Sequence, residues 1–339
     1  MMVPNIVWLE LTSTVRNVLI SASVIAAFTL THPVQAQQPA KIVRIGFLGP
    51  TSAASNLDRI EALRAGLRGL GYVEGKNLVI EYRWAEGKFD RLPELAADLI
   101  RLNVDVILTA GTPAIRAAKN ATTTIPIIMV SSGDPVAFGF VASLARPGGN
   151  ITGSSNFGPE LSAKRLELLK ETSPRIQRFG VLFNPDNSIN DRNLPAVEQA
   201  ANSLKVGLQR FEVRGADDFK NAFSTMTKQR IDAVALPDDD FLNASQSVIV
   251  ELVAKRRLPS IGRAEFAEAG GMIGYGVNYF DLYRRAAIFV DKIIKGARPA
   301  DLPVEQPMKF EFVINLNAAK ALNLTIPQSV LFRASKVIK

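Results

Sequence analysis

The side chains that most often carry catalysis and metal binding are nearly absent from this 339-residue sequence. It contains no cysteine, and its only histidine is His32. If His32 is removed with an export signal, a histidine-activated nucleophile is excluded, and zinc, haem and iron–sulfur sites lose their usual ligands. Carboxylate catalysis and oxygen-ligated Mg²⁺ or Ca²⁺ remain open. The residue types therefore favour binding a solute over transforming it, and we expect no metal and no cofactor.

The chemistry that remains is carried by small polar residues that follow apolar segments. Two segments combine glycine, hydroxyl groups and proline: Gly111-Thr112-Pro113 and Ser131-Ser132-Gly133-Asp134-Pro135. Most of these residues precede a predicted helix, whose free N–H groups and partial positive charge suit a carboxylate. Each residue alone is also a common helix cap, so the prediction depends on the set. The residues predicted to bind a ligand are Thr51, Ser52, Gly111, Thr112, Ser131, Ser132, Asp134, Asn156, Asn184, Asp238, Arg263, Tyr275 and Asn278.

Three consecutive carboxylates stand at 238–240. Like charges at this spacing repel one another, and an ammonium group or a metal ion would relieve the repulsion. Solvated helix capping explains them equally well. The segment lacks the downstream glycine and glutamate of a calcium loop, and no G-x-G-x-x-G motif follows a predicted strand.

Apolar runs of strand length alternate with amphipathic helical segments through a first unit. We expect strands at 42–48, 78–84, 104–109 and 125–130, with helices at 57–70, 90–102 and 113–120. The same alternation of strands and helices recurs in a second unit, with strands at 178–183, 208–213, 231–236, 258–262 and 272–277. Helices are expected there at 160–172, 193–205, 217–229, 244–257 and 281–295. Near-continuous apolar strands alternating with helices predict two doubly wound parallel α/β units, which bind ligands beyond the carboxyl ends of the strands.

The N-terminal segment reads as a cleaved export signal over 1–36. An uncharged apolar run covers 18–30, and Val34-Gln35-Ala36 offers the small residues that a signal peptidase cuts after. We therefore expect a periplasmic protein. The net charge is +8, yet basic residues cluster only in short groups such as Lys255-Arg256-Arg257, so no nucleic-acid partner is expected.

Several long strings match a known family. They include GLGYVEGKNLVIEYRWAEG at 69–87, SSGDPVAFGFVASLARPGGNITG at 131–153, AGGMIGYG at 269–276 and the segment 295–327. From about Lys41 onward the chain resembles the ABC transporter substrate-binding proteins of the tryptophan/tyrosine type, which have the type 1 periplasmic binding-protein fold.

The resemblance implies two lobes joined by three crossovers that close over a ligand. One lobe would comprise 41–155 plus 277–300, and the other 156–276 plus 301–339. Thr112 and Ser132 would hold the carboxylate of an α-amino acid, and Asp238 would hold its ammonium group. The implied partners are a small solute, most readily an amino acid or aromatic compound, and an inner-membrane ABC permease with its ATPase. We expect the receptor itself to be a monomer.

Two alternative functions stay open at this point. An exported carboxylate-dependent hydrolase or lyase would need two acidic groups that converge, such as Asp134 and Asp238. A ligand-sensing partner of a membrane receptor would share every sequence feature of a transport receptor. Neither the solute nor its charge follows from the sequence.

Overall fold

The computed structural model describes residues 42–339, in which strands and helices alternate as the sequence predicts. His32 and the predicted export signal over 1–36 lie outside the described residues. Within 42–339 no helix is both long enough and apolar enough to cross a membrane.

The first sheet contains five strands in the order β2-β1-β3-β4-β5, and every neighbouring pair is parallel. Its strands are β1 (Val43–Gly49), β2 (Leu78–Trp84), β3 (Val106–Ala110), β4 (Ile127–Ser131) and β5 (Ile151–Gly153). The strands β3 and β4 are buried throughout, which explains their mostly apolar sequences.

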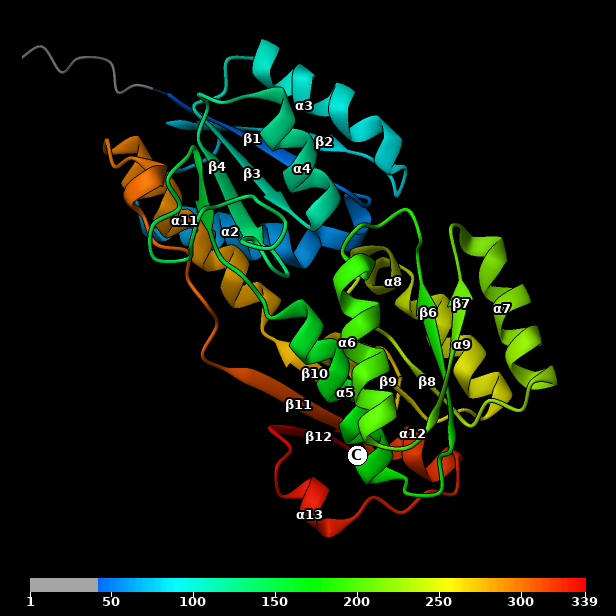
Figure 1. Cartoon of the computed structure of the whole chain (residues 1–339). Helices are drawn as coiled ribbons and strands as arrows, with labels where there is room; N and C mark the ends of the chain where they lie inside the picture. The colour runs from blue at the N-terminus through cyan, green and yellow to red at the C-terminus, as the bar shows by residue number, and fades with distance from the viewer. Residues whose placement is uncertain (1–41) are drawn as a thin grey trace, which may run out of the picture. The chain divides into compact units, whose positions relative to one another are not determined.

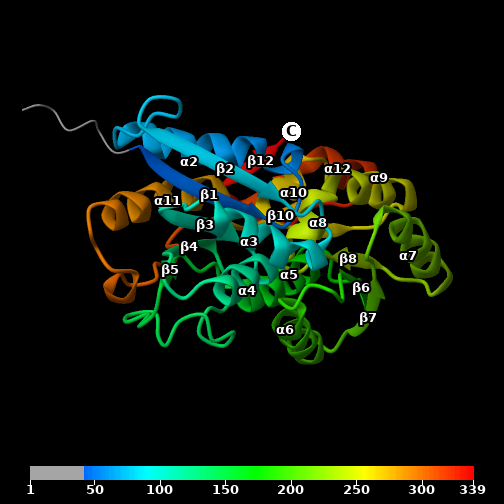
Figure 2. The same cartoon turned by 90° about the horizontal axis from the view of Figure 1, so that it is seen from above.

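Helices cover both faces of this sheet (Figure 1). Ile45 and Phe47 of β1 share a core with α2 (Leu57–Gly69) and α11 (Tyr279–Ile294). Leu48 points to the other face, where it packs with α3 (Leu92–Arg101) and α4 (Thr112–Ala121). Figure 2 also shows α2 and α11 side by side, although more than 200 residues separate them in the sequence.

The second sheet contains seven strands in the order β12-β11-β10-β9-β8-β6-β7. Its strands are β6 (Arg178–Phe183), β7 (Gly207–Glu212), β8 (Ala233–Ala235), β9 (Ser260–Gly262), β10 (Ile273–Val277), β11 (Phe310–Asn315) and β12 (Lys336–Ile338). All described pairs are parallel except β10 with β11. The chain leaves this sheet at Val277 and re-enters at Phe310, its register partner, so β11 must run back along β10.

The second sheet is also covered on both faces. α5 (Gly158–Thr172) and α6 (Asn190–Ser203) pack on one face, and α7 (Ala216–Lys228) and α9 (Gln246–Arg256) pack on the other. Both sheets are therefore doubly wound, as predicted. The short elements are α8 (Asp240–Ala244), α10 (Ala264–Glu268), α12 (Leu316–Ala321), α13 (Gln328–Leu331), η1 (Ala54–Asn56), η2 (Phe89–Arg91) and η3 (Pro299–Asp301).

The chain passes between the sheets three times: from β5 to α5, from β10 to α11, and from η3 to β11. The lobe boundaries at 155/156, 276/277 and 300/301 remain a prediction. Seven strands and α-helices within 42–339 were not predicted from the sequence: β5, α8, α10, β11, α12, α13 and β12. They have three to six residues each, which is too short to show a clear period.

Candidate functional site

The first sheet places hydroxyl groups at the carboxyl ends of β3 and β4. Gly111 (φ +83°) turns the chain directly into α4, so Thr112 becomes the first residue of that helix, with proline beside it. Thr112 is 2% exposed, and its Oγ1 has no hydrogen-bond partner among residues 42–339. Ser132 follows β4, and its buried Oγ is likewise unpartnered within the described chain. Both hydroxyl groups are therefore available to a ligand.

The second sheet contributes charged residues from the ends of β8 and β9. Arg263 follows β9, and its Nε donates to Asp238 Oδ1 over 2.6 Å. Its Nη2 donates to Asp240 Oδ1 over 3.0 Å. Its Nη1 is buried and finds no partner in the part of the chain that the structure describes. The repulsion within 238–240 is thus relieved by a guanidinium group of the protein itself.

Asp238 is the most heavily paired carboxylate of the site. Besides Arg263 it contacts Arg165 Nη2 at 3.5 Å, and Arg165 is fully buried on α5. The hydroxyl of Tyr279 donates to Asp238 Oδ1 at 2.9 Å. Burial alone would raise the pKa of Asp238, but Arg263 and Arg165 outweigh burial and hold that pKa below its ordinary value. Asp238 is therefore an ionised anchor for two arginines.

Tyr279 connects the charged cluster to the first sheet. Asn156 Nδ2 donates to the Tyr279 hydroxyl over 2.7 Å, while Asn156 Oδ1 is buried without a partner among residues 42–339. The guanidinium carbons of Arg263 and Arg59 lie over the Tyr279 ring, 4.3 Å and 4.8 Å from its centroid. Burial raises the pKa of Tyr279 far above its ordinary value, so the phenol stays protonated and donates.

These elements enclose a small cavity of about 20 Å³. Six of the predicted residues line it: Gly111, Thr112, Ser131, Asn156, Asp238 and Arg263. Gly133, Gly158, Asn187, Ile189 and Asp240 complete the lining. Ser132 stands between two lining residues. The structure thus brings together side chains from the carboxyl ends of strands in both sheets.

The other predicted residues do not line this cavity, and most have local roles. Thr51 Oγ1 accepts from Asn56 Nδ2, and Ser52 Oγ accepts from Ser55 N, in the turn before α2. Asp134 Oδ1 accepts from Ala137 N.

Two further predicted residues are held by nearby backbone or by packing. Asn184 Oδ1 accepts from Asp186 N. The Tyr275 ring packs against Phe310 and Phe312, while its carbonyl accepts from Arg165 Nε.

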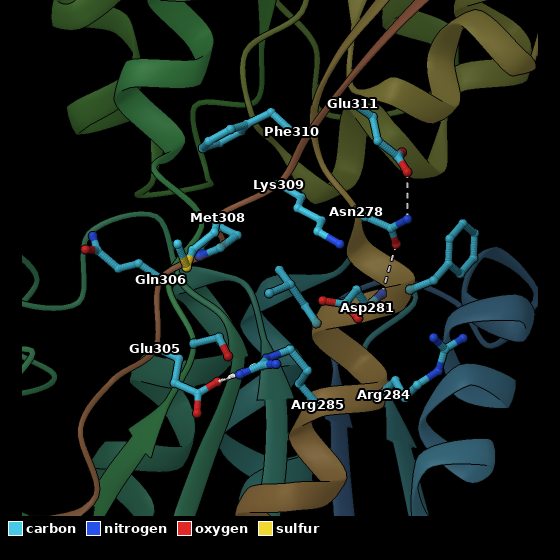
Figure 3. A pocket seen from close by; sticks show the side chains of 14 residues that line it. Asn278, Asp281, Arg284, Arg285, Glu305, Gln306, Met308, Lys309, Phe310 and Glu311 are labelled. Atoms are coloured by element: carbon cyan, nitrogen blue, oxygen red, sulfur yellow. Dashed lines mark hydrogen bonds and ion pairs between the residues drawn. The ribbon is translucent and has the colours of Figure 1, made fainter. Parts of the chain in front are cut away.

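Asn278 lines a different and larger cavity of about 930 Å³, between the first turns of α11 and the segment 305–311 (Figure 3). Four of its polar side chains form two pairs: Asn278 donates to Glu311 Oε1 at 2.6 Å, and Arg285 Nε donates to Glu305 Oε2 at 3.0 Å. Met308, on its rim, is 94% exposed. This groove is the larger of the two, but no buried side-chain atom that lacks a partner among residues 42–339 belongs to its lining. Three such atoms belong to the lining of the smaller cavity: Thr112 Oγ1, Asn156 Oδ1 and Arg263 Nη1.

Sequence reasoning missed Arg59, Arg165 and Tyr279, which all come from helices. A signal existed for Arg165, which lies on the buried stripe of α5 with Leu161, Leu168 and Leu169. A charged residue at core spacing requires a buried partner. Among residues 42–339, no group of three or more acidic, histidine or cysteine side chains is placed to hold a metal ion.

The chain belongs to the ABC transporter substrate binding protein family, whose profile matches residues 44–338. Proteins of this family bind small solutes and work with ABC transporters, which confirms the predicted family, fold and solute-capturing role. A curated relative, the tyrosine-binding protein of Clostridioides difficile (strain R20291), is 28% identical over 256 residues, covering 75% of this chain and 73% of the relative.

Two solved structures resemble this one closely. A conserved domain protein from Vibrio cholerae has a TM-score of 0.81 and 28% identity, and the match covers 88% of this chain and 100% of the other. An ABC domain from Streptococcus pneumoniae in complex with L-Trp has a TM-score of 0.80 and 26% identity, covering 87% and 99%.

Proposed function

We propose that this protein captures a small organic carboxylate between the elements that line the 20 Å³ cavity, and delivers it, unaltered, to an inner-membrane ABC permease with its ATPase. The observation that carries the proposal is the set of buried, unpartnered groups around that cavity, of which Thr112 Oγ1 and Arg263 Nη1 are donors. Burying a polar group without a partner is costly, and a ligand that supplies the partner removes the cost.

The amino end of α4 strengthens this assignment. A helix of ten residues presents free N–H groups and a partial positive charge beside Thr112. Relatives that bind tyrosine or L-Trp support a solute of similar size, an amino acid or other aromatic carboxylate. Asp238 is paired with two guanidinium groups, so we assign it the role of holding Arg263 in position.

Solute entry requires the lining elements to separate. A cavity of about 20 Å³ has room for about one water molecule, whereas small-molecule sites enclose about 300 Å³ or more. The three connections between the sheets are the places where a hinge motion would occur. The solute then favours a state in which the lobes close around it and the cavity is larger than about 20 Å³.

We further propose that the protein acts in the periplasm as a monomer. The predicted signal over 1–36 supports export. An adjacent permease and ATPase gene pair would favour transport over a role as a sensor for a membrane receptor.

The enzyme alternative is disfavoured by the placement of its two carboxylates. Asp238 lines the cavity with both oxygens paired, whereas Asp134 does not line it and caps a turn.

A melting-shift screen of the purified protein against amino acids and organic acids tests the proposal. A solute present at 100 times its Kd should add about 2.7 kcal/mol to the free energy of unfolding. Arg263→Lys should weaken binding at least tenfold, because lysine cannot reproduce the planar fork that contacts both Asp238 and Asp240. Met308→Ala, on the rim of the larger groove, should leave affinity unchanged. If Met308→Ala abolishes binding and Arg263→Lys does not, the solute binds in the groove.

A further inference from the structure

The buried groups that remain free at the small cavity are mostly donors. Thr112 offers a hydroxyl group and Arg263 offers Nη1. The first turn of α4 adds the N–H groups of Thr112 and Ala114, since Pro113 has none and Ile115 N donates to Gly111 O. Ser132, next to the cavity, offers a second free hydroxyl group. Such a set suits the two oxygens of a carboxylate.

The carboxylates at and around the cavity are already engaged. Asp238 is paired with Arg263, Arg165 and Tyr279, and Asp240 is paired with Arg263. Two guanidinium groups therefore face two carboxylates before any solute arrives. An ammonium group in the cavity would have to share Asp240, whose Oδ1 already pairs with the Arg263 guanidinium group, to gain a counter-charge.

Two further acidic groups lie near the cavity without lining it. Glu265 Oε1 accepts from Arg59, and its buried Oε2 has no partner among residues 42–339. Asp239 accepts from the N–H groups of Phe241 and Leu242 and from Asn190 Nδ2, and it does not line the cavity either.

Among the fully buried side-chain atoms of residues 42–339 that lack a partner, the one amide oxygen that lines the cavity is the neutral Asn156 Oδ1. The amide oxygens of Asn190 and Asn193 are also unpartnered in the described chain, but neither residue lines the cavity. One neutral oxygen satisfies a hydroxyl group well. A single neutral oxygen does not compensate for the hydration that an ammonium ion loses on burial. A buried ion requires either an oppositely charged partner or several hydrogen bonds.

We infer that the solute is an organic carboxylate without an ammonium group, an inference that rests on the proposed function. It is either a 2-hydroxy acid, whose hydroxyl donates to Asn156 Oδ1, or the corresponding unsubstituted acid. The amino acid of the same skeleton is the poorer ligand. The chain would thus differ in substrate class from relatives that bind tyrosine or L-Trp.

Matched trios that differ only at carbon 2 test the inference by titration calorimetry of the full protein at pH 7.5. Suitable trios are 3-phenylpropanoate, L-3-phenyllactate and L-phenylalanine; indole-3-propanoate, L-indole-3-lactate and L-tryptophan; and propanoate, L-lactate and L-alanine. In a trio that binds, the hydroxy or unsubstituted acid should bind at least tenfold tighter than the amino acid. Thr112→Val should weaken all carboxylates about tenfold, while Thr227→Val on α7, a matched control, should weaken none.

A substitution at Asn156 tests the inference from the opposite direction. Asn156→Asp is nearly isosteric and adds a carboxylate at the cavity, so the amino acid should gain at least tenfold relative to the hydroxy acid. If an amino acid binds as tightly as its analogues in the wild-type protein and Thr112→Val weakens it, the inference is overturned while the proposed function stands. If Asn156→Asp leaves the preference for the hydroxy acid over the amino acid unchanged, the inference is likewise overturned. If no member of any trio binds, the proposed function fails and the inference fails with it.

Discussion

The guanidinium group of Arg59 and the carboxylate of Glu265 lie 3.1 Å apart, although 206 positions separate them in the sequence. Arg59 belongs to α2, which packs on the first sheet, and Glu265 belongs to α10, which follows β9 of the second sheet. Their side chains are only 10% and 13% exposed. The pair therefore bridges elements of both sheets, next to the Tyr279 ring that Arg59 also contacts.

A double-mutant cycle on this pair should show strong coupling. Arg59→Met or Glu265→Met alone should each lower the free energy of unfolding by about 3 kcal/mol, because each leaves a mostly buried charge unpaired. The double variant should lose at least 1 kcal/mol less than the sum of the two. Urea unfolding measures all three. Arg298→Met, from a pair with side chains 77% and 59% exposed, should change stability by less than about 0.5 kcal/mol. Additive single effects would mean that the ion pair contributes nothing.

Asp239 should give the protein a distinctive pH dependence. Burial raises its pKa to about 6, with the Asp240 charge adding to the effect, against about 3.9 for an ordinary aspartate. Between about pH 4 and pH 6 the native protein binds more protons than the unfolded chain, so its free energy of unfolding falls as the pH rises. The stabilising contribution of protonated Asp239 is complete below about pH 4 and is lost as the pH rises through about 6. It amounts to roughly 3 kcal/mol.

The variant Asp239→Asn isolates this effect. Asparagine keeps an oxygen for the N–H groups of Phe241 and Leu242 but does not titrate. The free energy of unfolding of the variant minus that of the wild type should therefore increase by about 3 kcal/mol from pH 4 to pH 7, because only the wild type loses the contribution of Asp239. Chemical denaturation across this range measures the difference. A flat difference for Asp239→Asn would contradict the shifted ionisation.

Gly111→Ala should impair both stability and solute binding. Gly111 has φ +83°, and an added Cβ would lie 2.3 Å from Asp240 Oδ2. The left-handed backbone conformation should cost about 1–2 kcal/mol in stability. The displaced Asp240 should also disturb Arg263, so solute affinity should fall at least tenfold.

Gly71→Ala separates backbone strain from this contact. Gly71 has φ +89°, but no described heavy atom lies within 4 Å of the position of its added Cβ. It should show the backbone cost with unchanged solute affinity by calorimetry. Equal affinities for the two alanine variants would show that the Gly111–Asp240 contact is irrelevant to the site.

Much of the fold is readable from the sequence, because strand and helix periods are local properties. The mostly apolar runs at 106–110 and 127–131 identify buried parallel strands, and small polar residues at their ends identify the side of the sheet where a ligand belongs. Thr112 and Arg263 could be proposed for that reason. The antiparallel β11 could not, because its direction depends on where the chain returns after α11.

The pairing of charges lies beyond sequence reasoning. Asp238 stands in a row of three carboxylates that invites an external cation, yet its partners are Arg165, Arg263 and Tyr279, which are 73, 25 and 41 positions away. Helix periodicity places Arg165 on a buried face but does not say what it meets there. Chain order and residue type therefore establish the sheets and the polar strand ends. Packing of distant helices determines which charges neutralise each other and which buried groups stay free, because those contacts depend on distances that no local pattern encodes.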